Sequence, residues 1–255
     1  MSKIRTGHYL NVVKFDELIV ICKSYDLIYK PSKTSYSITA LELLSAEVKD
    51  ILLNVSQKEI AYAKDTNDRE LQFVDLKRLS TRVLLAAKSS GVTSVHFNDL
   101  VNVNRKIQGR RAVAITAEEK VTMKSQILNK SADPNLPLLK KNSVSQLSYD
   151  RLFNNFSKLV EVLKATPEFK PNEEELKITS LSAKLELMRL SNQIVSESTV
   201  NLSKVRFDRN QIMYLQENNL VDTAMAVKNY SKSVFGARSI QNKQLSGMRF
   251  TKLRN

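Results

Sequence analysis

The sequence contains few of the residues that break helices or form tight turns. Its 255 residues include only 5 glycines and 5 prolines. A β-sandwich or β-barrel needs a tight turn about every ten residues, so this composition disfavours both folds. Apolar residues make up 42% of the chain and charged residues 26%, which is ordinary for a globular protein. We therefore expect an all-α protein in which most of the chain is folded.

The residues that carry common enzyme chemistry are also scarce. His8 and His96 are the only histidines, and neither is spaced from another histidine, cysteine or glutamate as metal ligands are. The single cysteine, Cys22, cannot form an internal disulfide, and its apolar neighbours indicate a buried thiol. The glycines form neither a phosphate-binding loop nor a dinucleotide fingerprint. The sequence therefore predicts no catalytic residue, metal or cofactor, and we expect a protein that is not an enzyme.

Long apolar segments are absent as well. No segment approaches the ~20 consecutive apolar residues of a transmembrane helix. Residues 1–9 include basic side chains but lack the apolar stretch and cleavage site of a secretory signal. These features predict a cytoplasmic protein without a transmembrane segment, and they leave export by an unconventional route open.

The chain contains an internal repeat. When the sequence is aligned with itself at an offset of 140 residues, 12 of the 59 positions from 30 to 88 are identical. Chance would give roughly 6% identity. Identical pairs include Lys30-Pro31 with Lys170-Pro171 and Asp68-Arg69 with Asp208-Arg209. The repeat indicates a duplication, and the Asp-Arg pairs are expected to form equivalent ion pairs or to mark matching points on each long helix.

Both repeats predict the same series of helices. Short amphipathic helices are expected at 11–24 and 149–164, each followed by an extended segment at the Lys-Pro pair, because proline restricts the backbone there. Long helices should follow, ending near Phe73 and Leu215, with shorter helices at 79–89 and 221–233. In the second repeat, Asn172 is predicted to cap the long helix, with Glu173, Glu174 and Glu175 at the positive end of its dipole.

These elements predict an elongated helical bundle in which the two long helices pack antiparallel and the shorter helices fill the grooves. The expected organisation is a first helical repeat at 1–114, a basic linker rich in Ser, Asn and Lys at 115–147, and a second repeat with a basic C-terminal tail at 148–255.

The net charge of +14 is concentrated in segments that flank the predicted helices. Residues 102–117 contribute +4, residues 120–146 contribute +4, and residues 228–255 contribute +7 without an acidic residue. Tyr230, Phe235 and Phe250 interleave the last group, and cations beside aromatic rings suit phosphate neutralisation and base stacking. A solvated tail, or one that docks on an acidic face of another copy, fits the same pattern. The candidate nucleic-acid or partner-binding residues are Arg105, Lys106, Arg110, Arg111, Lys228, Lys232, Arg238, Lys243, Arg249, Lys252 and Arg254.

The segment from Ala226 to Ser239, with Ser246 to Leu253 after it, resembles the ends of uncharacterised helical proteins from Bacteroidetes-type bacteria. The opening from Gly7 to Leu10 is similar too, so the resemblance extends over the whole chain. It implies a helical fold and brings no known activity or site residue.

Two functions from different classes fit the sequence. The first is a structural or assembly protein that self-associates through its helices and basic terminal segments, as a homo-oligomer or filament. The second is a nucleic-acid-binding accessory protein that uses the basic C-terminal tail, and its affinity should fall steeply with salt. Attachment to acidic membrane surfaces, or pore formation by rearranging helices, is a third interpretation. No small-molecule substrate is indicated.

Overall fold

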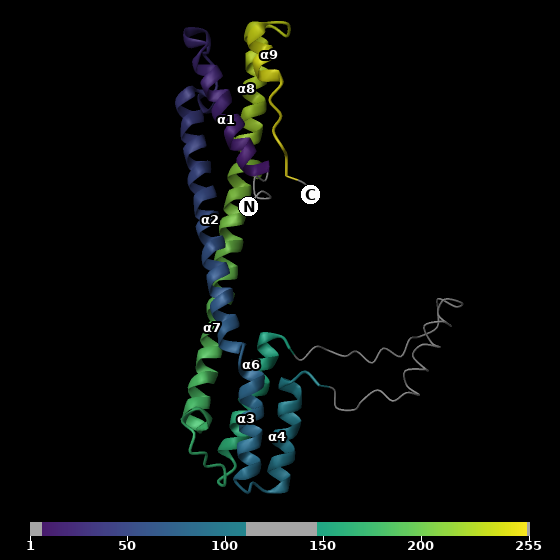
Figure 1. The fold of residues 1–255 in the computed structure, drawn as a ribbon. Coiled ribbons are helices and arrows are strands. Elements are labelled where there is room, and N and C mark those ends of the chain that lie inside the picture. Colours follow the sequence, from purple (N-terminus) through teal and green to yellow (C-terminus); the bar gives the residue numbers. More distant parts are fainter. Residues whose placement is uncertain (1–6, 111–146, 254–255) are drawn as a thin grey trace, which may run out of the picture. The chain divides into compact units, whose positions relative to one another are not determined.

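The computed structural model describes residues 7–110 and 147–253, which form helices joined by short connections (Figure 1). Within these two ranges there is no β-strand. The prediction of an all-α helical bundle is confirmed. Residues 115–146 of the predicted linker lie outside the described residues, as do Arg111 and Arg254.

The two repeats contain the same succession of helices. In the first repeat these are α1 (Gly7–Lys23), α2 (Ile38–Phe73), α3 (Leu76–Ser89) and α4 (Ser94–Ile107). In the second they are α6 (Tyr149–Lys164), α7 (Ile178–Asn210), α8 (Leu220–Phe235) and α9 (Ile240–Ser246). Short 3-10 helices occur at η1 (Asp26–Ile28), η2 (Thr34–Tyr36) and η3 (Glu174–Leu176), and η4 (Gln211–Leu215) is a π-helix.

The long helices of the two repeats correspond at the same offset of 140 residues as the aligned residues do. The long helices α2 and α7 begin at Ile38 and Ile178, and the 3-10 helices η2 and η3 that precede them are separated by the same 140 positions. Extended backbone separates each 3-10 helix from the long helix, at Ser37 and Lys177. The internal repeat therefore describes the order and length of the helices up to the ends of α2 and α7.

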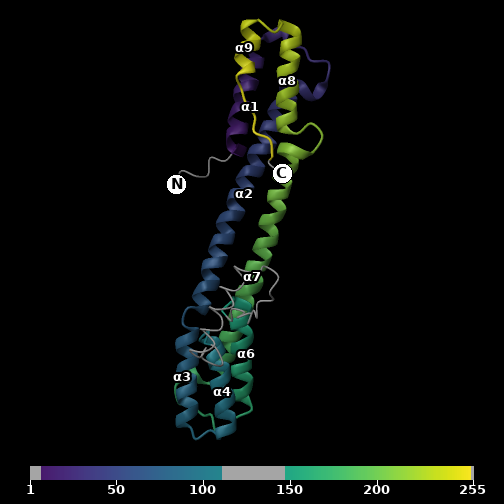
Figure 2. The same cartoon turned by 90° about the vertical axis from the view of Figure 1, so that its right-hand side faces the viewer.

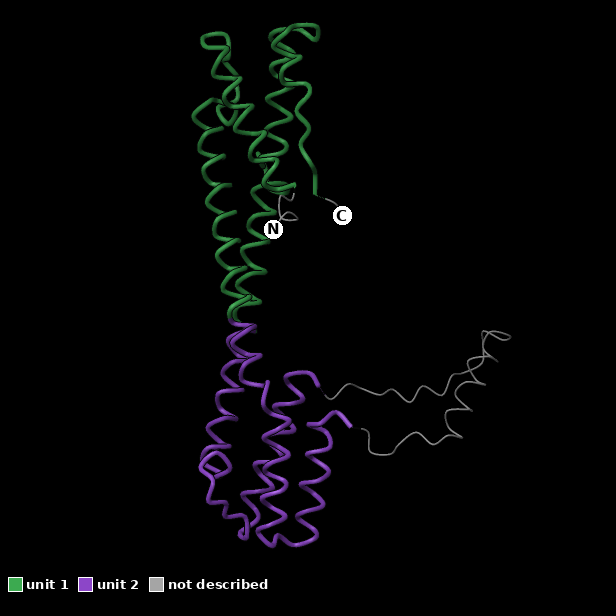
Figure 3. The backbone as a smooth tube through the Cα atoms, viewed as in Figure 1, with its two compact units in different colours: residues 1–64, 196–255 green, residues 65–195 purple. Residues whose placement is uncertain are grey.

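The compact units of the fold do not coincide with the repeats. Unit 1 combines residues 1–64 with 196–255, and unit 2 comprises residues 65–195 (Figure 3). Both long helices cross the boundary, so each repeat supplies its short first helix to one unit and its later helices to the other. The predicted ranges 1–114 and 148–255 therefore describe repeats in sequence, whereas each compact unit is built from both of them.

In unit 1, α1 packs against the beginning of α2 and against α8 and α9 from the other repeat. Further along the long helices, Val55 of α2 packs with Leu202 and Val205 of α7. The buried core of this unit comprises Val12, Phe15, Leu18, Ile19, Cys22, Tyr25, Tyr29, Leu41, Val48, Met213, Leu220, Val221, Ala224, Val227 and Leu245. Helix α1 and the segment that contains η2 thus tie the first repeat to α8, and α1 also contacts α9.

In unit 2, α6 takes the place that α1 has in unit 1. It lies side by side with α4 in both views of the fold, and its buried residues share a core with those of α3 (Figures 1 and 2). The buried residues of α6 include Phe156, Leu159 and Val160, which are the repeat counterparts of Phe15, Leu18 and Ile19 in α1. Equivalent short helices therefore bury equivalent side chains against helices of the opposite repeat.

Side-chain caps define where several helices begin. Ser148 accepts a hydrogen bond from the backbone amide of Arg151 at the start of α6, and Asn219 accepts one from Asp222 at the start of α8. The predicted cap at Asn172 is wrong, because Asn172 is followed by η3 (Glu174–Leu176) and α7 begins only at Ile178. The acidic residues serve other contacts: Glu174 pairs with Lys177, and Glu175 pairs with Arg82.

Two helices were not predicted from the sequence. Helix α4 was overlooked although Phe97, Leu100, Val103 and Ile107 recur at helical spacing, and α9 lies within the segment interpreted as a basic tail. Gly236 lies directly after α8 with a φ of +84°, a left-handed conformation that favours glycine.

No described helix is both long enough and apolar enough to cross a membrane.

Candidate functional site

The predicted basic residues fall into two groups that belong to different units. Arg105 and Lys106 lie in the last turn of α4 and Arg110 follows it, all in unit 2. The remaining described candidates lie in unit 1, on α8, α9 and the segments next to them. The two groups are therefore separate features of the molecule.

The segment after α9 is held against α1 by side-chain hydrogen bonds. The buried Asn11 side chain donates to the Thr251 carbonyl at 2.8 Å and accepts from the Thr251 amide at 2.9 Å. The Lys14 ammonium donates to the Arg249 carbonyl at 2.7 Å. The described residues of this segment are therefore held in place within unit 1. They do not form the solvated tail that the sequence suggested.

Lys228 has a structural role in this arrangement. Its ammonium donates to the carbonyl oxygens of Met248 at 2.6 Å and Ser246 at 3.3 Å, and burial lowers the pKa of the Lys228 ammonium. These carbonyls belong to the last residue of α9 and to the segment directly after it, where backbone acceptors lack helical partners. Lys228 thus stabilises the turn into the final segment.

The other cations of this group face solvent. None of them makes an ion pair with any described residue, and no acidic residue occurs after Asp222. We call this set the C-terminal basic face; it consists of Lys232, Arg238, Lys243, Arg249 and Lys252. Five cations on adjoining elements of one unit form an electropositive surface suited to an anionic partner.

The aromatic residues interleaved with these cations are used inside the protein. The Tyr230 ring contacts the Tyr29 ring edge-on at a centroid distance of 5.4 Å, and its hydroxyl accepts a hydrogen bond from the Lys30 amide. The Phe235 ring packs on Tyr25 at 4.7 Å. Phe250 is packed against the unit 1 core. These contacts leave the three rings only partly exposed, which limits their use in base stacking.

A second feature, missed by the sequence analysis, is an exposed apolar stripe on α7 in unit 2. Leu187, Leu190 and Ile194 are 51%, 40% and 47% exposed. With Ala183 they recur at alternating intervals of four and three residues, so they lie on one face of the helix. Leu181 and Met188 lie on a different face of α7, and their side chains are fully buried.

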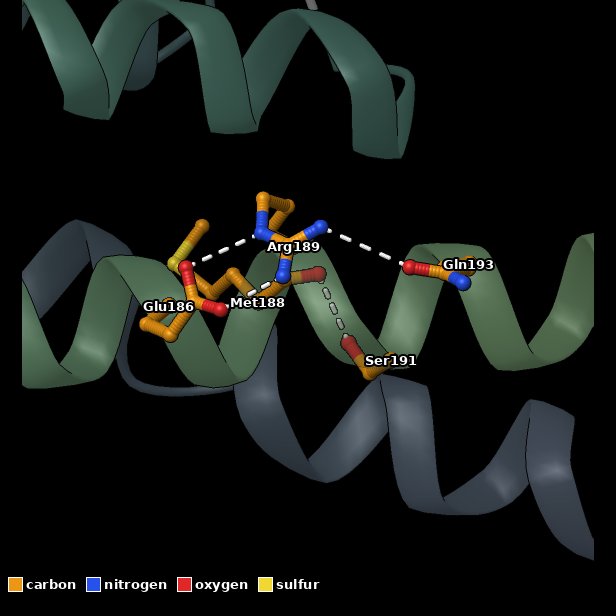
Figure 4. Close-up of polar contacts among 5 residues, drawn as sticks. All are labelled: Glu186, Met188, Arg189, Ser191 and Gln193. Atoms are coloured by element: carbon orange, nitrogen blue, oxygen red, sulfur yellow. Dashed lines mark hydrogen bonds and ion pairs between the residues drawn. The ribbon is translucent and has the colours of Figure 1, made fainter.

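Polar side chains on the same part of α7 contact one another within the helix (Figure 4). The Arg189 guanidinium forms two hydrogen bonds with the Glu186 carboxylate, at 2.9 and 2.6 Å, and reaches Gln193 at 3.4 Å. Hydrogen bonding to Arg189 lowers the pKa of Glu186, and the same bonds raise the pKa of Arg189. The charges beside the stripe are therefore satisfied within α7, and the apolar side chains are left uncovered by any described element.

The repeated Asp-Arg pairs mark equivalent positions but do not form ion pairs among the described residues. In unit 2, the Arg69 guanidinium lies over the Tyr149 ring at 4.1 Å from its centroid. In unit 1, Arg209 donates from Nε and Nη2 to the Asn210 side-chain oxygen at 3.2 and 2.9 Å. The prediction of matching ion pairs is wrong, and each arginine instead lies near the start of the short first helix.

Next to Arg209, unit 1 contains a groove of about 500 Å³. Its lining residues are His8, Tyr9, Leu52, Val55, Ser56, Glu59, Arg206 and Arg209. Arg206 pairs with Glu59 at 2.8 Å, and His8 Nδ1 lies 2.7 Å from the Tyr214 hydroxyl. Burial, and secondarily the charge of Arg209, lowers the pKa of His8. In the sequence, the repeated arginine was the only signal for this groove.

Among residues 7–110 and 147–253, no group of three His, Cys, Asp or Glu side chains lies close enough together to hold a metal ion. No protein-family model, curated protein or solved structure matches the chain. What the protein does must therefore be inferred from its own surfaces and grooves.

Proposed function

We propose that this chain is a non-enzymatic assembly protein that self-associates through the exposed α7 stripe. The observation that carries the proposal is the spacing and exposure of Leu187, Leu190 and Ile194. Intervals of four and three residues are those of the a and d positions in a coiled coil, whose apolar seam is buried by a second helix. Because no described element covers these side chains, a second copy of the chain supplies the partner helix.

The residues beside the stripe support this interpretation. Taking Leu187 and Ile194 as a positions places Glu186 and Gln193 at g and Lys184 at e, where polar and charged side chains border a coiled-coil seam. Leucine at d with leucine or isoleucine at a is compatible with pairing of two helices. An apolar contact of this kind should persist as salt is raised, since screening weakens interactions between exposed charges.

Light scattering coupled to size exclusion, over a range of protein concentrations and at low and moderate salt, tests the proposal. We expect an oligomer that persists at moderate salt and that Ile194→Glu converts to a monomer. Val200→Glu is the matched control, because Val200 is an exposed apolar residue on another face of the same helix, 67% exposed. A monomer at every concentration, or equal loss of association in both variants, would contradict the proposal.

The C-terminal basic face favours a second candidate function, binding of nucleic acid through phosphate contacts. Its cations are exposed and unpaired with described residues, whereas the nearby aromatic rings are packed inward. This combination supports backbone contacts without base stacking, and therefore binding with little sequence preference. Each neutralised phosphate contributes about −0.9 to the slope of log affinity against log salt, so five contacts give a slope of roughly −4 to −5.

Fluorescence anisotropy with a labelled duplex at several salt concentrations tests this second candidate. The triple variant Lys243→Gln, Arg249→Gln and Lys252→Gln should weaken binding and reduce the salt slope by about 3. Substituting Arg105, Lys106 and Arg110 with glutamine removes the same charge from unit 2 and should leave binding unchanged. Binding that is absent at low salt, or that responds equally to both triple variants, excludes the C-terminal basic face as the site.

A further inference from the structure

We propose that the groove of unit 1 binds one small organic monocarboxylate. The arginine side chains hold its carboxylate, and its apolar portion lies against Leu52 and Val55. This site is independent of the α7 stripe and of the C-terminal basic face, and it does not rest on the proposed assembly function.

Three elements of unit 1 bring the lining residues together. Leu52, Val55, Ser56 and Glu59 follow one another at helical spacing on one face of α2, and Arg206 and Arg209 are three residues apart on α7. His8 and Tyr9 close the groove from the first turn of α1. A volume of about 500 Å³ lies within the range of small-molecule sites in proteins.

The charged side chains around the groove add up to a net charge of +1. Arg206 is neutralised by Glu59, with 2.8 Å between their charged atoms. Arg209 has no acidic partner among the described residues; its hydrogen-bond acceptor is the neutral amide of Asn210. The lowered pKa of His8 keeps its imidazole neutral at pH 7. A monoanion is therefore the ligand charge that this groove complements.

The direction of the donors favours a carboxylate group. Nε and Nη2 of Arg209 each donate one hydrogen to Asn210, which leaves both Nη1 hydrogens and the second Nη2 hydrogen for a ligand. Arg206 donates one Nη2 bond to Glu59 and retains further donors. Guanidinium groups bind carboxylates through paired N–H donors, which strengthens such contacts relative to neutral hydrogen bonds.

The base of the groove is apolar. Val55 is buried in the cluster with Leu202 and Val205, and Leu52 is packed against the unit 1 core. An aliphatic or aromatic group attached to the carboxylate can cover these side chains and gain the free energy of apolar burial. The groove therefore has the mixture of an apolar wall and few polar groups that is typical of ligand sites.

The repeat provides an internal comparison. The equivalent arginine in unit 2, Arg69, is covered by the Tyr149 ring, which fills the position that a ligand could take. Arg209 has no such ring over it among the described residues. Directly after it, the chain forms η4, whose wider turn buries Met213 and brings Tyr214 to His8. π-Helical turns occur frequently at functional sites, and this one occurs only beside the open groove among the described residues.

Isothermal titration calorimetry with sodium octanoate tests the proposal on the full chain. We expect octanoate to bind with one-to-one stoichiometry, and acetate and octylammonium to bind far more weakly, because the first lacks the apolar portion and the second carries the opposite charge. Arg209→Gln should reduce octanoate affinity by about tenfold or more, since it removes a charge-assisted contact. Arg249→Gln makes the same change on the C-terminal basic face and should bind octanoate as the parent chain does.

Two further measurements separate the proposed contact from a general loss of folding. Circular dichroism should show that Arg209→Gln retains its helical content. Arg209→Lys should retain part of the affinity, because it keeps the charge but loses the paired donors. Octanoate binding that is undetectable in the parent chain, equal in parent and Arg209→Gln, or matched by octylammonium overturns the proposal.

Discussion

At the residue scale, Cys22 illustrates how burial controls chemistry. The thiol is fully buried in the unit 1 core, and this burial raises its pKa to about 12. Only the thiolate reacts readily with alkylating reagents. We expect iodoacetamide at pH 8 to leave the folded protein unmodified and to alkylate Cys22 in urea, as measured by intact mass. Rapid alkylation of the folded chain would show that the thiol is accessible.

His8 gives the stability of unit 1 a pH dependence. Because its pKa is lowered in the folded state, the unfolded chain binds the proton more readily. The stabilising effect of keeping His8 neutral is therefore complete above its unfolded pKa of about 6.5, and is lost as pH falls through the lower folded pKa. We expect urea unfolding of His8→Gln to show a smaller decrease in stability below pH 6.5 than the parent chain. Identical pH profiles would contradict this assignment.

Only some of the candidate-site residues could be predicted from the sequence. Charge counting identified the cations of the C-terminal basic face, but it gave equal weight to Lys228, whose ammonium binds backbone carbonyls. Adjacency in sequence likewise suggested that Tyr230 and Phe235 accompany the cations, although their rings pack inward. Sequence position fixes which residues are near one another along a helix, but the packing of other elements decides which side of that helix remains open.

At the scale of elements, the contact between α1 and the final segment depends on one side chain. Asn11 is fully buried, and it satisfies both the amide and the carbonyl of Thr251. Asn11→Ala removes these bonds and should lower the free energy of unfolding by about 1–3 kcal/mol, measured by urea denaturation. Hydrogen exchange at residues 249–253 should become faster.

Asn54→Ala is the control for this substitution, because Asn54 is an exposed asparagine on α2 of the same unit. It should change stability by less than about 0.5 kcal/mol. If both alanine variants had equal stability and equal exchange at residues 249–253, the final segment would be held by other contacts.

The sequence predicted elements best where apolar periodicity was strong. The bounds 149–164 for α6 and the end of α2 at Phe73 are confirmed. The start of α7 was wrong because glutamates after Asn172 were interpreted as helix-dipole partners, whereas two of them pair with Lys177 and Arg82. Helix α9 was missed because it has only seven residues and a single buried apolar side chain, Leu245. Such a helix depends on its Ser239 cap and on packing that local sequence does not reveal.

At the scale of the whole molecule, the sequence showed that the chain contains a repeat, but it did not show which helices pack together. Self-alignment shows which residues are equivalent, but it cannot show that α1 packs with α8 and α9 while α6 packs with α4. Each unit therefore contains a contact between the two halves of the chain. Both cores depend on that contact, since each draws buried side chains from both repeats.

This arrangement predicts that cutting the chain between residues 110 and 147 leaves the two fragments bound to each other. A protease site inserted there should yield fragments that co-elute on size exclusion in native buffer and separate in urea. The uncut protein with the inserted site is the control for elution volume. Fragments that separate in native buffer would show that the apolar contacts within each unit are too weak to hold the halves together.

The sharing of both cores also affects how the chain acquires its structure during synthesis. Phe15 and Leu18 leave the ribosome early, but Leu220 and Val221, which complete the same core, lie about two hundred residues later. At about 5–20 residues per second, this interval corresponds to roughly 10–40 s. During that time the apolar face of α1 is not yet covered by α8, and exposed apolar surface favours aggregation or chaperone binding. Unit 1 can therefore complete its fold only late in the synthesis of the chain.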